Sequence, residues 1–153
     1  MHYLYNHNYK YIFIYFRFSD VLGPVGFSAY STENTYLDPG EVAHFDALIS
    51  NIGGHFNPST SSFVCPYHGV YLFSINFNSE DSNDLQLAIV IDSEVKVQAY
   101  ADYNDDLTTG SALVIVECGP SQVAWVKCNG NGGNLRGDSS RKTHFAGYLL
   151  HAY

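Results

Sequence analysis

Two loops rich in carboxylates hold the side chains best suited to binding a metal ion or a polar ligand. These are Glu80, Asp81 and Asp84 in the first loop, and Asp102, Asp105 and Asp106 in the second. Carboxylate oxygens are the ligands that calcium takes, so both loops are candidate calcium or ligand sites. The simpler interpretation is solvated acidic loops that keep the surface soluble. The neighbouring rings of Tyr100 and Tyr103 could stack on a sugar ring or be ordinary loop tyrosines.

A second candidate is the triplet Arg136, Gly137 and Asp138, which lies in a Gly/Asn-rich loop expected over residues 129–138. Integrins recognise this triplet, so it is a possible adhesion site. The triplet is short and also arises by chance, which makes an ordinary loop the competing interpretation.

Catalytic chemistry has no positive support in the sequence. The histidines of the chain's main part are scattered, with no H-x-H pair: His44, His55, His68, His144 and His151. Metal-binding jelly-roll enzymes use closely spaced histidines with a carboxylate. No G-x-S-x-G, P-loop or H-E-x-x-H motif occurs either. The sequence therefore predicts that the chain is not an enzyme, and no metal ion is assigned firmly.

The three cysteines, Cys65, Cys118 and Cys128, do not have the spacing of a metal site. All three are interpreted as small buried hydrophobic residues, or else one thiol is free or paired between chains. A hairpin turning near residues 120–121 would place Cys128 opposite about residue 113, so Cys118 and Cys128 are not expected to pair.

The composition indicates one domain with an aromatic core. The chain has 153 residues, of which 16% are aromatic and only 14% charged, unlike a helical bundle. Its net charge is -8, and the 15 acidic residues all follow the first 18 residues. Such a surface repels phosphate backbones, so nucleic acid is excluded as a partner.

Residues 1–23 differ from the rest, and residues 1–18 contain no Gly, Pro or acidic residue. The apolar run Tyr11–Phe16 is too short for a membrane span or an ordinary secretion signal, so no membrane insertion is expected. An extra edge strand, a truncated secretion signal and a wrongly predicted start of the reading frame remain open, and the last is favoured.

From residue 24 onwards the chain reads as about ten short strands separated by turn residues. The expected strands are 25–30, 42–49, 55–57, 61–65, 69–77, 85–91, 95–100, 112–117, 123–128 and 144–151. The strands at 85–91 and 95–100 are expected to form a hairpin. This pattern predicts an all-β fold, a ten-stranded antiparallel jelly-roll sandwich of two sheets over residues 24–153.

Large aromatic residues at unequal intervals mark the centre of this pattern, and no helical period fits them. The residues are Phe45, Asn51, Phe56, Phe63, Gly69, Tyr71 and Phe73. Each short strand is expected to deliver one large side chain to a shared core. In the segment 69–73, alternation places Tyr71 and Phe73 on one face.

This series resembles the globular head domain of complement component 1q, a family that shares its fold with tumour necrosis factor. Seven of eight pattern positions match, and Ile75 replaces the final aromatic residue. Phe145 and Gly147 resemble the closing Phe-x-Gly-aromatic-Leu strand of the family. The resemblance covers about residues 24–153. These residues specify the fold, while ligand binding is expected in loops.

The resemblance implies a secreted homotrimer that takes part in innate immunity. It also implies lectin-like pattern recognition of microbial glycans or other repeated ligands, and some family members bind calcium. A cytokine-like or adhesive ligand for a cell-surface receptor is the alternative. No collagen-like Gly-X-Y stem precedes the domain, which argues against collagen-driven assembly.

Overall fold

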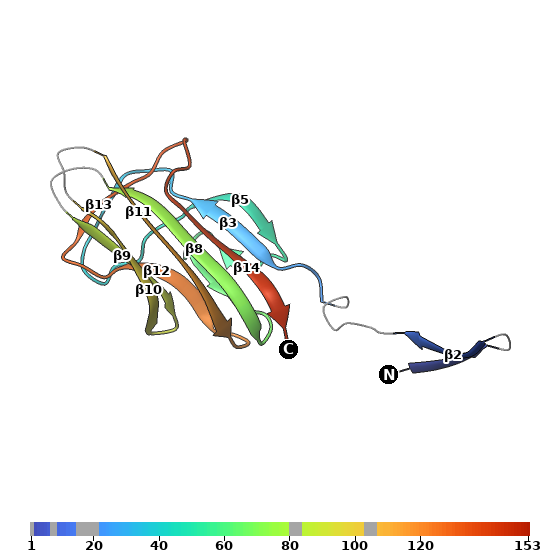
Figure 1. The fold of residues 1–153 in the computed structure, drawn as a ribbon. Coiled ribbons are helices and arrows are strands. Elements are labelled where there is room, and N and C mark those ends of the chain that lie inside the picture. Colours follow the sequence, from blue (N-terminus) through green and yellow to red (C-terminus); the bar gives the residue numbers. More distant parts are fainter. Residues whose placement is uncertain (1, 7–8, 15–21, 80–83, 103–106) are drawn as a thin grey trace.

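The computed structural model describes residues 2–6, 9–14, 22–79, 84–102 and 107–153. Its strands from residue 26 onwards form two antiparallel sheets, as the sequence predicts (Figure 1). None of the described residues forms a helix long and apolar enough to cross a membrane.

The larger sheet has seven strands, with the long strand β8 at its centre. β8 pairs with β11 along one edge, and with β14 and then β13 along the other. The order continues from β14 to β3 and β5, and from β13 to β4. The bounds are β3 Gly26–Tyr30, β4 Thr35–Leu37, β5 Ala47–Ile52, β8 Gly69–Ser79, β11 Thr108–Cys118, β13 Gly133–Arg136 and β14 His144–Ala152.

The smaller sheet has five strands in the order β10-β9-β12-β7-β6. Its bounds are β6 Phe56–Asn57, β7 Ser62–Val64, β9 Leu85–Ile91, β10 Glu94–Ala101 and β12 Val123–Cys128. β9 and β10 form the expected hairpin, and Asp92 in its turn has a φ of 54°. A positive φ is tolerated by Asp and Asn in turns of this kind.

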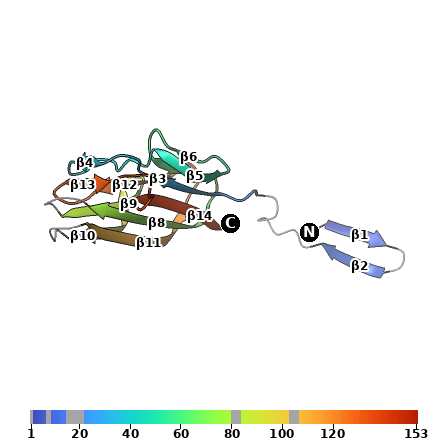
Figure 2. The same ribbon diagram turned by 90° about the horizontal axis from the view of Figure 1, so that it is seen from above.

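Near the N-terminus, β1 (His2–Asn6) and β2 (Tyr9–Ile14) pair with each other in a two-stranded sheet of their own (Figure 2). They do not pair with the strands of either sheet of the sandwich, and the status of residues 1–23 stays a prediction.

Aromatic side chains fill the space between the two large sheets. Phe27 from β3 stacks on Phe56 and Phe63 with ring centroids 4.5 and 5.0 Å apart, and meets Phe145 edge-on at 4.9 Å. Tyr71 and Phe73 are both fully buried on one face of β8, as alternation predicts. Ring pairs in these geometries add stability beyond the area that they bury.

Two details of the strand prediction are wrong. The sandwich contains twelve strands within the described residues, because β4 and β13 form where loops were expected. Phe45 reaches the core from a segment outside any strand, where its backbone N–H donates to Ser61 Oγ at 2.8 Å. Ile75, the one departure from the aromatic series, is 1% exposed and fills the same kind of core position.

Candidate functional surfaces

Asn51, the polar member of the series, closes a turn instead of facing a ligand. Its Nδ2 donates to the Phe56 carbonyl at 2.8 Å, and its Oδ1 accepts from the Phe56 N–H at 3.1 Å. The loop that it closes contains Gly53 and Gly54, both with positive φ. Asn51 therefore has a structural role.

The two glycines of the series are required by close packing. A Cβ on Gly69 would lie 2.2 Å from the His151 carbonyl oxygen, beside the irregularity that interrupts the β14–β8 register after Leu149. A Cβ on Gly147 would lie 2.6 Å from ring atoms of both Phe27 and Phe73. A side chain at either position would force the strands apart.

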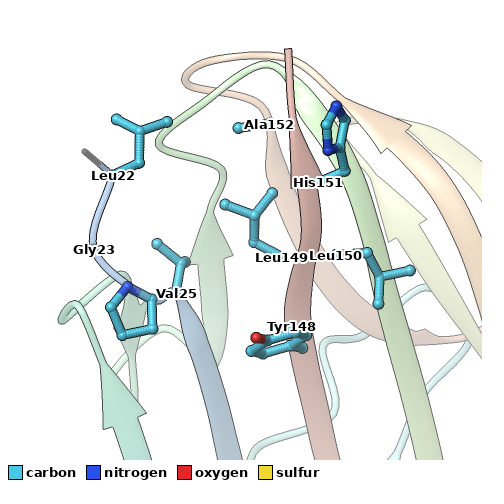
Figure 3. Close-up of a pocket in the computed structure, with 9 residues that line it drawn as sticks. Leu22, Gly23, Val25, Tyr148, Leu149, Leu150, His151 and Ala152 are labelled. Carbon is cyan, nitrogen blue, oxygen red and sulfur yellow. The ribbon is translucent and has the colours of Figure 1, made fainter. Parts of the chain in front are cut away.

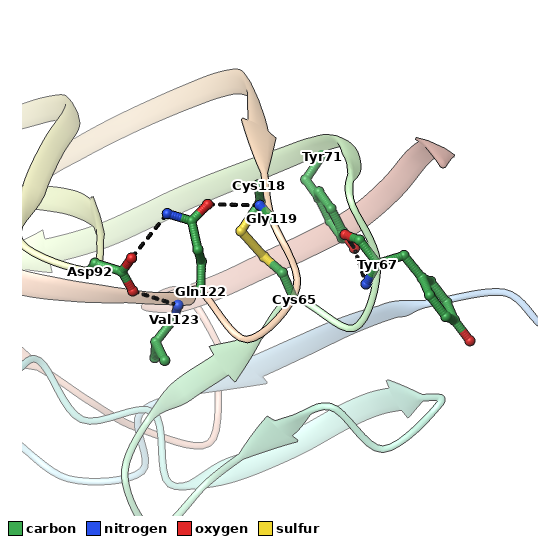
Figure 4. The surroundings of a disulfide bond; sticks show 8 residues. All are labelled: Cys65, Tyr67, Tyr71, Asp92, Cys118, Gly119, Gln122 and Val123. Carbon is green, nitrogen blue, oxygen red and sulfur yellow. Dashed lines mark hydrogen bonds between the residues drawn. A yellow bond between two sulfur atoms is a disulfide. The ribbon is translucent and has the colours of Figure 1, made fainter. Parts of the chain in front are cut away.

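A disulfide joins Cys65 to Cys118, with a Cα–Cα distance of 6.3 Å (Figure 4). It links the segment after β7, in the five-stranded sheet, to the end of β11, in the seven-stranded sheet. The interpretation of all three cysteines as merely small buried hydrophobic residues is therefore wrong for Cys65 and Cys118, which are buried but bonded to each other. Cys118 does not pair with Cys128, as expected, and Cys128 is free and buried.

Next to the disulfide, polar side chains tie two turns together. Gln122 Oε1 accepts from the Gly119 N–H, and its Nε2 donates to Asp92 Oδ2 at 3.0 Å (Figure 4). Asp92 Oδ1 also accepts from the Val123 N–H at 3.0 Å. The hydrogen bond from Val123 lowers the pKa of Asp92 most, and the bond from Gln122 lowers it further.

The acidic loops are described only in part. Asp84 and Asp102 are exposed, whereas Asp81, Tyr103, Asp105 and Asp106 lie outside the described residues. Over the described ranges, no group of three or more His, Cys, Asp or Glu side chains is arranged to hold a metal ion. Calcium binding by these loops stays a prediction.

The Arg136–Asp138 triplet does not lie in a fully exposed loop. Arg136 ends β13, and its Nε donates to Asp138 Oδ2 at 3.2 Å, with both side chains about one-third exposed. The N–H of Gly137 donates to Asn34 Oδ1, and a Cβ on Gly137 would meet the Glu33 backbone. Its two charged members are thus paired with each other.

Two of the histidines come together at the end of the sandwich where the chain terminates. The rings of His68 and His151 lie 4.9 and 5.6 Å from the ring of Tyr153. The Tyr153 hydroxyl donates to Glu117 Oε1 at 2.8 Å, and this bond raises the pKa of Tyr153. His44, His55 and His144 lie elsewhere in the chain's described part.

Exposed apolar residues gather on the outer face of the seven-stranded sheet, a surface that the sequence did not reveal. The register aligns Ile52, Gly26, Tyr148, Leu72 and Ile115 in one row across β5, β3, β14, β8 and β11. Ile115 is 59% exposed and Tyr148 50%. We call this row, together with Leu113 and Leu150, the apolar face.

A pocket of about 230 Å³ adjoins the apolar face (Figure 3). It lies between residues 22–25, which lead into β3, and residues 148–152 at the end of β14. Tyr148 and Leu150 belong both to the pocket and to the apolar face. The pocket therefore extends this face toward the end of the sandwich.

The outer face of the five-stranded sheet differs in chemistry. Its outward positions near β9 and β10 carry the amides of Gln86 and Gln98 and the exposed ring of Tyr100. The two faces lie on opposite sides of the sandwich because each belongs to a different sheet. The outward positions near β9 and β10 are thus mainly polar, unlike the row on the seven-stranded sheet.

Comparison with protein families gives a match to the family described as C1q domain, over residues 26–150. Complement C1q tumor necrosis factor-related protein 6 of Mus musculus is 31% identical over 111 residues, covering 71% of this chain and 42% of the relative. A complement C1q subcomponent of the same species is 28% identical over 131 residues, covering 82% and 51%. The chain thus spans about half or less of these relatives.

Solved structures show the same fold at low identity. The globular domain of zebrafish complement 1qA protein aligns with a TM-score of 0.70 at 18% identity, covering 84% of this chain and 99% of that one. Murine APRIL aligns with a TM-score of 0.65 at 10% identity, covering 83% and 99%. These likenesses confirm the two-sheet jelly-roll fold, and the family match confirms the resemblance seen in the sequence.

Proposed function

Since this chain belongs to the C1q domain family, we propose that it is a secreted, trimeric recognition domain that binds repeated microbial glycans in innate immunity. The family is one of recognition domains and not of enzymes, which confirms that the chain is not an enzyme. Three weak binding sites on one trimer would gain avidity on a repetitive surface.

The apolar face is the observation that supports the trimeric part of the proposal. Four of its side chains, Leu113, Ile115, Tyr148 and Leu150, are each 47–59% exposed. A group of exposed apolar side chains on one face of a chain with a net charge of -8 marks an interaction site. We assign the apolar face to contacts between copies of this chain, because burying this face does not require the loops to be covered.

Secretion is supported by the disulfide. Disulfides persist in oxidising compartments and are rare in the cytosol. Cys65 and Cys118 are bonded and fully buried, and they link the two sheets of the sandwich. A chain that depends on this link is suited to an extracellular setting.

Trimer formation is tested by placing a charge on the apolar face. Ile115→Asp is expected to convert a trimer, of three times the 17.0 kDa chain mass, into monomers in light scattering after size-exclusion chromatography. Val64→Asp is the matched control, because Val64 is 41% exposed on β7 of the other sheet. A wild-type protein that is monomeric would sink the trimer proposal.

Ligand class is tested on a glycan array, with and without a calcium chelator. Binding of wild-type protein to microbial glycans is the expected result. Loss of binding with chelator would favour a calcium role for the acidic loops that contain Asp84 and Asp102. The absence of binding under both conditions would sink the glycan proposal.

The alternative function is that of a cytokine-like or adhesive ligand for a cell-surface receptor. The adhesive version is tested by Arg136→Ala, which would abolish cell adhesion if the triplet binds an integrin. We expect no effect, because Arg136 is already paired with Asp138 within the chain. Receptor binding without any glycan binding would favour the cytokine-like version.

A further inference from the structure

Five polar and aromatic side chains gather at one end of the outer face of the five-stranded sheet. Gln86 on β9 is the register partner of Tyr100 on β10, and the Asn129 N–H donates to the Gln86 carbonyl at 2.9 Å. These contacts place Tyr100, Gln86 and Asn129 in one row across three neighbouring segments. With Gln98 and Asp84, they form what we call the amide–tyrosine patch.

Hydrogen bonds hold the three amides of the patch in place. Gln98 Oε1 accepts from Gln86 Nε2 at 2.5 Å and from Asn129 Nδ2 at 2.7 Å. Gln98 Nε2, Gln86 Oε1 and Asn129 Oδ1 have no side-chain partner among the described residues. The patch thus offers both donors and acceptors on side chains that are already ordered, which lowers the entropy cost of binding.

The aromatic ring of the patch is exposed and held in place. Tyr100 is 53% exposed, and its hydroxyl donates to Asp84 Oδ2 at 2.5 Å. This bond raises the pKa of Tyr100 to about 12. A fixed ring beside planar polar groups matches a sugar, which has an apolar C–H face and a rim of hydroxyls.

The charge around the patch restricts the ligand. The carboxylates of Asp84 and Asp102 both act on Tyr100, and the chain carries a net charge of -8. This field repels sialylated, sulfated and phosphorylated polymers and leaves neutral sugars unaffected. The patch also lies on the sheet opposite the apolar face, so contacts between copies through that face leave it open.

We propose that the amide–tyrosine patch binds a neutral pyranose sugar. The ring of Tyr100 packs against the C–H face of the sugar, and the amides of Gln86, Gln98 and Asn129 contact adjacent hydroxyls. The inference rests on the proposed function, since it names the surface through which glycans are recognised.

The test measures binding to polyacrylamide conjugates of mannose, glucose, galactose and N-acetylglucosamine by surface plasmon resonance. Wild-type protein is compared with Tyr100→Ala, Gln98→Ala and the control Tyr36→Ala, whose ring is 49% exposed on β4 of the other sheet. Tyr100→Ala and Gln98→Ala are each expected to weaken binding about tenfold, and Tyr36→Ala less than about twofold. Circular dichroism and thermal melts confirm that each variant is folded.

The outcomes separate this inference from the proposed function. Wild-type binding that Tyr100→Ala and Gln98→Ala leave unchanged overturns the patch, while glycan recognition stands. Wild-type protein that binds none of the conjugates or any array glycan overturns both. Tyr100→Phe keeps the ring but removes its hydrogen bond to Asp84, so a smaller loss than in Tyr100→Ala is expected. A loss as large as in Tyr100→Ala would overturn the packing role of the ring.

Discussion

Gly147 shows how a single residue limits the packing of the core. Its Cα faces the rings of Phe27 and Phe73, and an added Cβ would lie 2.6 Å from both. The two rings are buried within the hydrophobic core, so they can move only by displacing neighbouring side chains. We expect Gly147→Ala to lower the free energy of unfolding by about 1–3 kcal/mol, measured by urea denaturation.

Gly23→Ala is the matched control for this prediction. An added Cβ at Gly23 would meet no atom within 4 Å, so its free energy of unfolding is expected to change by less than about 0.5 kcal/mol. Equal stability of the two variants would show that the core adapts around residue 147.

Asp92 is expected to make the free energy of unfolding depend on pH in the acidic range. Its pKa is lowered by hydrogen bonds from Val123 and Gln122, so the folded chain holds the carboxylate more strongly than the unfolded chain does. This stabilisation is present above the unfolded pKa of about 3.9 and is lost as the pH falls through the lower folded value. Asp92→Asn keeps the turn conformation but cannot titrate.

The free-energy difference between wild-type protein and Asp92→Asn is therefore expected to shrink as the pH falls from 7 to below 3. Urea denaturation across this range measures the difference. A constant difference would show that the carboxylate charge contributes nothing.

Among the structural elements, the Cys65–Cys118 disulfide joins β11 to the segment after β7. The bond closes a loop with a sequence separation of 53 residues. Loss of such a cross-link costs about 2–4 kcal/mol, mainly through the greater freedom of the unfolded chain. We expect the double variant Cys65→Ala/Cys118→Ala to lose this much stability in urea denaturation.

Cys128→Ala is the control, because it removes a buried sulfur without removing a cross-link. A reducing agent is expected to destabilise wild-type protein and Cys128→Ala but not the double variant. Equal sensitivity of all three proteins would contradict the prediction.

Strands formed by continuous apolar runs could be predicted from the sequence, and the short strands β4 and β13 could not. β9 has the predicted bounds, 85–91, because its apolar run is bounded by turn residues. β4 and β13 are only three and four residues long and pair with each other, so their signals depend on partners about 100 residues apart. Phe45 was expected in a strand. Its backbone N–H instead donates to the Ser61 side chain, a contact that the local sequence pattern does not show.

The candidate surfaces were harder to predict than the fold. The run from Ala112 to Val116 is apolar throughout, so its sequence does not show that Leu113 and Ile115 face outwards. The alignment of Ile115 with Leu72 and Tyr148 joins three strands that are distant in the sequence. Tyr100 was recognised as a possible sugar-stacking residue, but its amide neighbours were not, because their proximity depends on strand register.

On the scale of the whole molecule, our two proposals assign assembly to one face and recognition to the other. The apolar face lies on the seven-stranded sheet, and the amide–tyrosine patch lies on the five-stranded sheet. In the proposed trimer, association through the apolar face would leave three copies of the amide–tyrosine patch facing the surroundings. Assembly should then increase binding to dense glycans without changing any individual site.

Ile115→Asp tests this separation, because it acts on assembly and leaves Tyr100 and its neighbours unchanged. We expect the monomeric variant to bind dense sugar conjugates about 10²–10⁴-fold more weakly than the trimer, since avidity is lost. Its affinity for the free monosaccharide, measured by calorimetry, should equal that of wild-type protein. If the free-sugar affinity falls as well, the apolar face contributes to the binding site and the two faces are not independent.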